Sequence, residues 1–257
     1  MKTILAITLL VVLGAPARVV FAIDHKNLDE NRPLRLEDAY PIASGEIAIE
    51  AGAGLALQRR GPNRGFFPVE VLYGALPNLQ LGIGTVLSTN PREIEDPPKS
   101  GDLRASALYN FNQETLTLPA FAVKVGVDAP TGIGARGFGI EAKGIITKSF
   151  DRLSLHLNAA YEFFTASRTE ERDGRYKLAI GGSYPVGAPQ FTRATLVADV
   201  FAEQPLRRGE SPVVGTEVGL RYQLTPRIVW DIGAGTEFVG PANRSSVFLT
   251  TGFSLGF

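Results

Sequence analysis

The stretch that decides the fold is Ser246–Phe257, SVFLTTGFSLGF, because its large hydrophobic residues recur at every second position. Successive side chains of an extended strand point to opposite faces, so this alternation gives one apolar and one polar face. The apolar face carries Val247, Leu249, Thr251, Phe253, Leu255 and Phe257. Apart from Phe248, the opposite face carries serine, threonine and glycine, so the stretch predicts a strand between two different environments.

The same period of two continues through the chain from Glu46 onward, and each run ends in Gly, Pro, Asn or Asp, as strands and turns do. The 28 glycines, the 17 prolines and the single methionine do not favour a helical protein. The runs predict about twelve strands, at residues 46–57, 66–76, 79–89, 102–111, 119–129, 138–149, 153–166, 176–186, 192–204, 213–224, 228–238 and 246–257.

The connections between these strands alternate in length. The connections after even-numbered strands are short, and they are Pro77–Asn78, Asn112–Glu114, Phe150–Arg152, Gly187–Gln190 and Thr225–Arg227. The connections after odd-numbered strands are longer and more polar, at residues 58–65, 90–101, 130–137, 168–175, 205–212 and 239–245. Short periplasmic turns and longer external loops are typical of bacterial outer-membrane barrels, as is an even number of strands.

Two further features favour a membrane barrel over a water-soluble β-sandwich, which remains the alternative. No segment after the N-terminal region is apolar for long enough to form a transmembrane helix, so a spanning chain must close into a barrel. Outward aromatic residues gather near the short turns and the C-terminus, as in an interfacial girdle: Tyr73, Tyr109, Tyr184, Tyr222, Trp230 and Phe257. We predict an all-β, transmembrane, antiparallel up-and-down barrel over residues 46–257, with Phe253, Leu255 and Phe257 as its C-terminal assembly signal.

The N-terminus has the layout of a secretory signal peptide. A lysine at position 2 precedes the apolar run Ile4–Gly14, and alanines follow at positions 15, 17 and 22. Cleavage after Ala17 or Ala22 fits this layout, and the second site leaves residues 1–22 as the signal peptide. We then expect residues 23–45 to form a periplasmic leader or a partial plug, and the protein to reach the outer membrane of a Gram-negative cell. The chain has no cysteine, which excludes disulfides and thiolate chemistry.

The polar faces of the predicted strands must line the lumen, because charged side chains are costly on a lipid-facing surface. The acids at these positions are Glu46, Glu50, Glu70, Asp102, Asp128, Glu141, Glu162, Asp199, Glu203, Glu217, Asp231 and Glu237. The bases are Arg104, Lys124, Lys143, Lys177, Arg193 and Arg221, with His156. They either pair across strands and brace the wall, or make an electronegative lumen that favours cations and polar neutral solutes. Twelve strands give a bore between a filled and an open barrel, so we expect a narrow, charge-lined passage that the leader partly occupies.

Three short segments resemble a known family. They are the leader with its continuation (Arg32-Pro33-Leu34, Glu37-Asp38-Ala39, Gly45-Glu46 and Glu50), the strand end Asp128-Ala129-Pro130-Thr131-Gly132, and the run Leu155–Tyr161. They are similar to the bacterial outer-membrane family labelled putative MetA-pathway of phenol degradation, over most of the mature chain. The resemblance implies a channel or transporter, with hydrophobic or aromatic compounds among its solutes, and it brings no catalytic residues.

Other motifs favour no enzyme or cofactor. Gly132–Gly137 matches G-x-G-x-x-G, but an alternating strand follows instead of the helix that a dinucleotide site needs. His156 has Ser154 and Asn158 on the same face, too far along the strand for a nucleophile and its base. With 26 basic and 26 acidic residues the chain offers no field for nucleic acid. We therefore predict a passive outer-membrane channel for small molecules, with a lipase-like or esterase-like barrel, or a purely structural one, as alternatives.

The predicted partners follow from this placement. They are outer-membrane lipid, the barrel assembly machinery through the C-terminal strand, and small-molecule solutes. Lipopolysaccharide phosphates are a further candidate for the loop Arg168–Arg175, RTEERDGR, although its alternating charge is more typical of a solvated loop.

Overall fold

The twelve strands predicted from the alternating pattern form one closed antiparallel barrel. The structure is a computed structural model that describes residues 23–29, 32–89, 101–133 and 135–257. Its strands are β1 (Ile47–Gln58), β2 (Arg64–Leu76), β3 (Leu79–Ser88), β4 (Leu103–Asn110), β5 (Ala120–Ala129), β6 (Gly139–Phe150), β7 (Leu153–Phe164), β8 (Gly174–Val186), β9 (Ala194–Glu203), β10 (Val213–Thr225), β11 (Ile228–Val239) and β12 (Ser245–Gly256). The fold prediction is confirmed, and strand ends differ from those expected by two residues or fewer.

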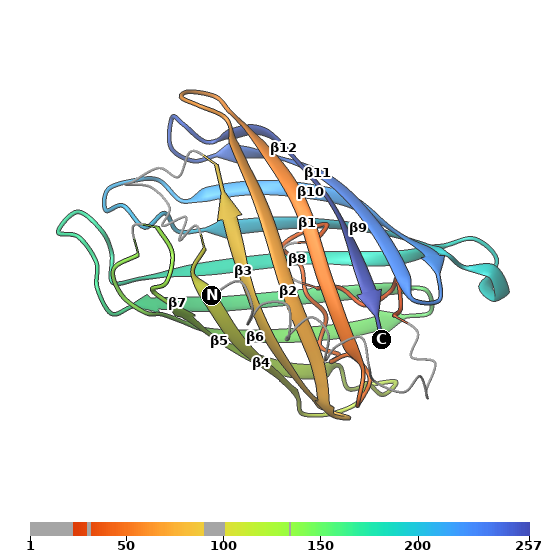
Figure 1. Cartoon of the computed structure of the whole chain (residues 1–257). Helices are drawn as coiled ribbons and strands as arrows, with labels where there is room; N and C mark the ends of the chain where they lie inside the picture. The colour runs from red at the N-terminus through yellow and green to blue at the C-terminus, as the bar shows by residue number, and fades with distance from the viewer. Residues whose placement is uncertain (1–22, 30–31, 90–100, 134) are drawn as a thin grey trace, which may run out of the picture.

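Each strand pairs with the next one along the chain, and β1 pairs with β12 to close the ring (Figure 1). The closing pair runs in register from Ala48 opposite Gly256 to Leu57 opposite Val247. Closure leaves no strand edge with unpaired backbone groups, which is the condition for a sheet to lie in hydrocarbon. No helix in the part of the chain that the structure describes is long and apolar enough to cross a membrane.

Two short connections differ from their predicted lengths. β4 and β5 are joined by residues 111–119 rather than by a tight turn at 112–114. Pro119 cannot donate a ladder hydrogen bond, and the Asn112 side chain binds the Pro119 carbonyl instead, so the hairpin closes later. β8 and β9 are joined by residues 187–193, which include the single-turn 3-10 helix η1 (Pro189–Phe191).

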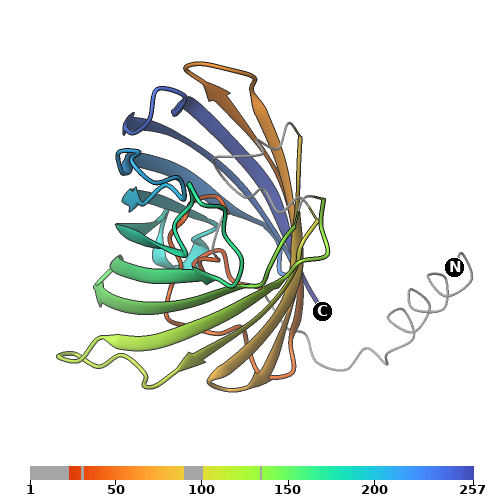
Figure 2. The ribbon, with the colours of Figure 1, turned by 90° about the vertical axis from the view of Figure 1, so that its left-hand side faces the viewer.

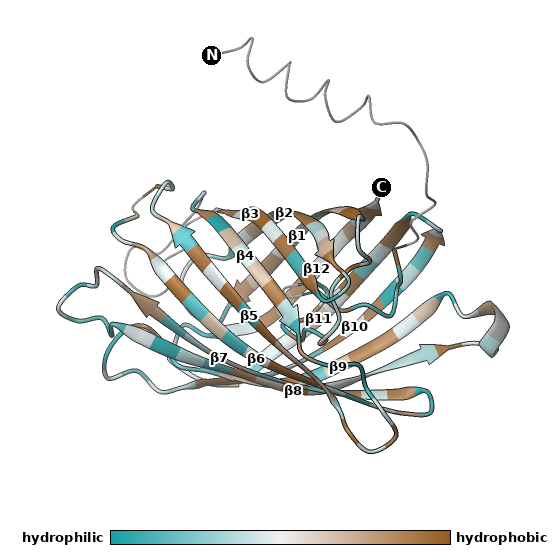
Figure 3. Cartoon of the chain, turned by 90° about the horizontal axis from the view of Figure 1, so that it is seen from below, coloured by the Kyte–Doolittle hydropathy of each residue, from teal (hydrophilic) through white to brown (hydrophobic). Residues whose placement is uncertain are grey.

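The two faces of the wall meet opposite environments. Along β7 the outward residues Leu155, Leu157, Tyr161 and Phe163 are exposed, whereas the inward residues His156, Asn158 and Glu162 are buried. Figure 3 shows this alternation as bands of hydrophobic and hydrophilic colour along the strands. An apolar exterior around a charged interior suits a barrel surrounded by lipid. Of the six predicted girdle residues, Tyr73, Tyr109, Tyr184 and Phe257 are exposed on this exterior, whereas Tyr222 and Trp230 are half-buried.

A charge on the outward face should therefore destabilise the barrel. Leu157 lies near the middle of β7 and its side chain is 41% exposed. We expect Leu157→Arg to destabilise the barrel by about 2–4 kcal/mol, the cost of arginine at the bilayer midplane. Unfolding by urea in lipid vesicles measures this change. Leu116→Arg is the control, since Leu116 is fully exposed in the β4–β5 connection, and an equal loss of stability there would contradict a lipid-facing wall.

The barrel interior is filled mainly by residues 23–45, here called the leader, of which the structure describes 23–29 and 32–45. Figure 2 shows this segment inside the ring of strands. The three buried apolar clusters each combine leader residues with inward residues of the wall. The predicted signal peptide, residues 1–22, lies outside the described residues, as does most of the loop between β3 and β4.

Candidate functional site

The leader enters the lumen, turns, and returns along the opposite wall. In its first limb, the imidazole Nδ1 of His25 lies 2.8 Å from the hydroxyl of Thr195 on β9. In its second limb, the backbone N–H of Ala39 donates to the hydroxyl of Thr147 on β6 over 3.0 Å. The N–H of Ile42 donates to the side chain of Gln80 on β3 over 2.9 Å. The leader thus ties opposite sides of the barrel together.

Four inward glycines make room for the turn of the leader at Arg32 and Pro33. A Cβ atom on Gly219 of β10 would lie 2.7 Å from Pro33 Cγ, and one on Gly233 of β11 would lie 2.8 Å from the Pro33 carbonyl oxygen. Cβ atoms on Gly52 and Gly252 would lie 3.0–3.2 Å from Arg32 atoms. The wall is therefore bare of side chains where the leader approaches most closely.

Arg32 is buried at this turn and holds the leader to three strands. Its guanidinium pairs with the carboxylate of Glu50 on β1, and its Nη1 lies 3.5 Å from Asp231 Oδ2 on β11. The same Nη1 donates to the Phe253 carbonyl over 2.8 Å. Arg221 extends the network, with Nη2 3.6 Å from Asp29 Oδ2 of the leader. Charges buried this deeply are tolerated because each has an opposite partner.

Glu37 holds the second limb between two lysines. Its carboxylate oxygens lie 2.7 Å from Lys124 Nζ on β5 and 2.9 Å from Lys143 Nζ on β6. The amide of Asn158 on β7 accepts from the Glu37 N–H over 2.7 Å and donates to the Glu37 carbonyl over 2.8 Å. All four residues are buried, so this contact fixes both the charge and the backbone of the leader.

Asp38 organises the leader itself. One carboxylate oxygen accepts from the Leu28 N–H and the other from the Tyr40 N–H, each over 2.8 Å, which joins the two limbs. Burial raises the pKa of Asp38 from 3.8 to about 7, although these two N–H groups act in the opposite direction. Burial likewise raises the pKa of Tyr40, whose hydroxyl donates to Glu114 in the β4–β5 connection.

The shifted pKa of Asp38 predicts a pH dependence of leader docking. A leader outside the lumen has Asp38 in water with a pKa near 3.8, so the docked form holds the proton more tightly. Docking is then strongest below about pH 4 and weakens as the pH rises to about 7. We expect a higher open probability in planar bilayers at pH 8 than at pH 5, and a smaller difference in Asp38→Asn. An unchanged pH response in that variant would show that another group titrates.

Between the leader and the external rim lies a water-accessible vestibule. Its main cavity has a volume of about 340 Å³, and two smaller cavities of about 210 Å³ and 110 Å³ adjoin residue Arg35. The main cavity is lined by the cations Arg32, Arg35, Arg64, Arg104, Lys124, Arg175 and Lys177. It is also lined by the acids Glu50, Glu70, Asp102, Asp128, Glu162, Glu217 and Glu237. Seven cations face seven carboxylates, so the vestibule is charged but balanced.

The count of twelve acids and six bases, on which the alternative of an electronegative lumen rested, omitted four of these cations. Arg64 and Arg175 belong to strands that begin two residues earlier than predicted, and Arg32 and Arg35 come from the leader. Pairs brace the wall: Arg104 with Asp128 and Glu141, and Lys177 with Glu141 and Glu162. In the vestibule the numbers of cations and carboxylates are therefore equal, and the excess of acids that the sequence count gave is not found there.

The remaining predicted lumen residues lie as follows. Glu70 lies on β2 and accepts from Ser106 over 3.3 Å. Asp199 and Glu217 lie opposite each other on β9 and β10. Arg193 differs from the prediction, because it is exposed in the connection before β9 rather than within the lumen wall. The C-terminal residues Phe253, Leu255 and Phe257 point outward, with Phe253 and Phe257 exposed.

His156 is buried beneath the leader with both ring nitrogens at hydroxyl groups. Nδ1 lies 3.0 Å from Thr147 Oγ1, and Nε2 lies 3.1 Å from Ser183 Oγ on β8. The serine near His156 thus comes from the neighbouring strand rather than from position 154. The third group is a threonine rather than a carboxylate, so the arrangement lacks the acid that orients histidine in a triad. Among the described residues no group of histidine, aspartate and glutamate could hold a metal ion.

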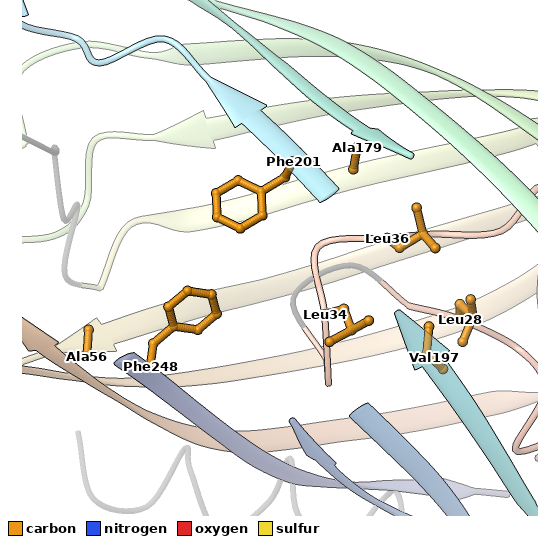
Figure 4. Packing of buried hydrophobic residues seen from close by; sticks show 8 residues of the cluster. All are labelled: Leu28, Leu34, Leu36, Ala56, Ala179, Val197, Phe201 and Phe248. Atoms are coloured by element: carbon orange, nitrogen blue, oxygen red, sulfur yellow. The ribbon is translucent and has the colours of Figure 1, made fainter. Parts of the chain in front are cut away.

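Apolar residues line one side of the vestibule floor. The cluster of Leu28, Leu34 and Leu36 packs with Phe201 of β9 and Phe248 of β12, together with Ala56, Ala179 and Val197 (Figure 4). The rings of Phe201 and Phe248 meet edge to face with centroids 6.3 Å apart. These residues give the lumen an aromatic surface beside its charged ones.

Comparison with known proteins agrees with this geometry. The family described as "Putative MetA-pathway of phenol degradation" matches residues 37–255. An outer-membrane channel from Pseudomonas putida F1 has a TM-score of 0.64 at 13% identity, covering 86% of this chain and 98% of that one. The KdgM porin has a TM-score of 0.55 at 11% identity, covering 82% of this chain and 99% of that one. The NanC porin has a TM-score of 0.56 at 12% identity, covering 82% of this chain and 98% of that one. At these identities the likeness shows a shared fold. A comparison with curated proteins finds no matching sequence.

Proposed function

The chain belongs to the MetA-pathway phenol degradation family, and from that premise and the geometry of the lumen we propose that it is an outer-membrane channel for small molecules. The vestibule of about 340 Å³ carries this proposal, because it is lined by polar side chains and ends on the leader rather than on the wall. A path that is obstructed by a segment outside the wall can open without breaking the backbone hydrogen bonds between the strands. The leader is thus a plug that solute passage must displace.

The solutes that we propose are small and include aromatic compounds. The family description supports the aromatic class, and the channel and porin fold of the similar structures supports passage without catalysis. In this chain an aromatic ring could stack against Phe201 and Phe248 on the vestibule floor once the Arg35 guanidinium, which lies 3.7 Å from the centre of the Phe201 ring, moves aside. The charged residues would bind the polar group of such a solute.

The proposal includes export and placement in the outer membrane. Residues 1–22 would be removed during export, and the assembly machinery would recognise Phe253, Leu255 and Phe257. Arginines of the external loop Arg168–Arg175 would contact lipopolysaccharide phosphates. The even number of strands and the lipid-facing exterior support this placement.

Swelling of liposomes that contain the purified protein tests the channel proposal. Neutral and charged solutes of increasing size are added outside, and small solutes should produce swelling faster than in protein-free liposomes. The rate should fall steeply with solute size because a twelve-stranded barrel is narrow. Swelling no faster than in protein-free liposomes, with the leader present or removed, would leave a structural barrel.

A further inference from the structure

Arg35 occupies a distinctive position in the lumen, because it lines all three of the vestibule cavities. Its side chain is about a third exposed, in contrast to the buried Arg32 three residues earlier. The guanidinium carbon lies 3.7 Å from the centroid of the Phe201 ring and 5.4 Å from that of Phe248. Arg35 is therefore a solvent-accessible cation stacked on an aromatic surface.

Carboxylates from three neighbouring strands surround the same guanidinium. Glu217 of β10 accepts from the Arg35 backbone N–H over 2.7 Å and from Nη1 over 3.2 Å. Glu237 of β11 lies 4.0 Å from Nη2. Asp199 of β9 lies opposite Glu217 in the strand register and interacts electrostatically with Arg35. We call Phe201, Phe248, Asp199, Glu217 and Glu237 the Arg35 box.

The box offers more acceptors than Arg35 uses. Asp199 is only 3% exposed, and its carboxyl group receives no hydrogen bond from an N–H group or a hydroxyl group among the described residues; it instead contacts the carboxyl group of Glu217 on the adjacent strand. Two buried carboxyl groups in contact need either a shared proton or a neighbouring cation, and a second cationic group in the box would supply both positive charge and hydrogen-bond donors to this pair. Glu203, which is also nearby, already pairs with Arg175 at 2.9 Å and does not share this property.

The chemistry of the box indicates organic cations rather than metal ions. An aromatic face with carboxylates at its edge binds a planar guanidinium through cation–π contact and forked hydrogen bonds. The described acids include no group arranged to hold a metal ion. The protein's own Arg35 shows that a guanidinium fits.

We infer that the Arg35 box is a binding site for small guanidinium compounds, which Arg35 occupies until such a compound enters from the external side. This inference rests on the proposed channel function, which it deepens by naming a class of solute. The cavity of about 110 Å³ leads from the external rim to Arg35. It is lined by the acids Glu203, Glu210 and Glu237 and by the bases Arg64, Arg175 and Arg244. Because Arg35 lies two residues after Pro33, its displacement would pull on the turn of the leader. A bound solute thus loosens the plug.

Rescue of an Arg35→Ala variant tests the site without any transport measurement. Thermal unfolding in detergent is recorded with N-ethylguanidinium and with the neutral N-ethylurea at equal concentrations. We expect N-ethylguanidinium to raise the Tm of Arg35→Ala, whereas N-ethylurea should not, and the shift in wild type should be smaller because Arg35 competes. Equal effects of both compounds on Arg35→Ala would overturn the inference.

Two acid substitutions in the Arg35→Ala background localise the effect. Glu217→Gln should abolish the shift, whereas Glu70→Gln, which removes a lumen carboxylate on β2, should preserve it. A shift that survives Glu217→Gln would overturn the site. If Arg35→Ala does not fold, calorimetric titration of wild type and Glu217→Gln with N-ethylguanidinium decides instead: saturable binding by wild type alone supports the site, and no binding overturns it. Binding without liposome swelling would contradict the channel proposal and leave the site standing.

Discussion

Gly219→Leu is expected to raise the single-channel conductance several-fold, because the new side chain would occupy the space that Pro33 now fills. A Cβ atom at this position would lie 2.7 Å from Pro33 Cγ, closer than packed carbon atoms approach. The rest of a leucine side chain needs more room still, so the turn of the leader must leave the wall. The same Cβ atom would lie 3.1 Å from the Ile232 carbonyl oxygen of β11, so the two strands must shift by a few tenths of an ångström; the ladder hydrogen bonds between them can be kept. Planar-bilayer recording of the purified variant measures the effect.

A matched control separates loss of the plug from a general effect of leucine in the wall. Gly144 of β6 points outward, and a Cβ atom there would meet only the Ala159 carbonyl oxygen, at 3.9 Å. Gly144→Leu should therefore leave the conductance at the wild-type value. Removal of residues 23–44 gives the upper limit of the conductance. A Gly219→Leu channel that conducts like wild type, while the truncated protein conducts more, would show that the turn at Pro33 is not what limits the passage.

The sequence predicted the barrel because each strand alternates between two solvents. In β12 and β7 most apolar residues are exposed on the outside and the polar residues are buried within, with Phe248 and Phe164 as inward exceptions, so a period of two appears over ten or more residues. Turn residues then located the strand ends to within two positions. The β4–β5 connection was mispredicted because the alternation stops before the chain turns, and Pro119 delays the next strand.

The contents of the lumen were predictable in kind but not in arrangement. Inward acids and bases followed from strand phase, so Glu50, Lys124 and Asp231 were foreseen as lumen candidates. Their partners Arg32 and Glu37 were not, because the leader has no repeating pattern from which a direction could be inferred. The one available signal was compositional: the leader combines buried-type leucines with charged residues of both signs, which suits a segment packed inside a charged wall.

Loss of Arg32 should destabilise the docked leader more than any other single charge change. Arg32→Ala leaves the carboxylates of Glu50 and Asp231 buried without their shared cation. Removing one partner of a buried ion pair costs about 3–5 kcal/mol. Release of the leader avoids this cost, because water then enters the lumen and solvates the two carboxylates. We expect a lower Tm in detergent, together with a conductance close to that of the protein without residues 23–44. Arg136→Ala is the control, since Arg136 pairs with Glu171 in the external loops and is 40% exposed, where such pairs contribute about 0–1 kcal/mol.

Neutralising the two carboxylates should reverse much of the Arg32→Ala effect. In the triple variant Arg32→Ala, Glu50→Gln, Asp231→Asn, the positive charge and its two buried acceptors are removed together, so no uncompensated charge forces the leader out. The hydrogen bond from Arg32 to the Phe253 carbonyl stays lost, and recovery should be partial. If the triple variant conducts as freely as Arg32→Ala alone, then shape and hydrogen bonding hold the turn of the leader in place, and the buried ion pairs contribute little to its docking. If closure returns, electrostatic pairing with β1 and β11 is what keeps this channel shut.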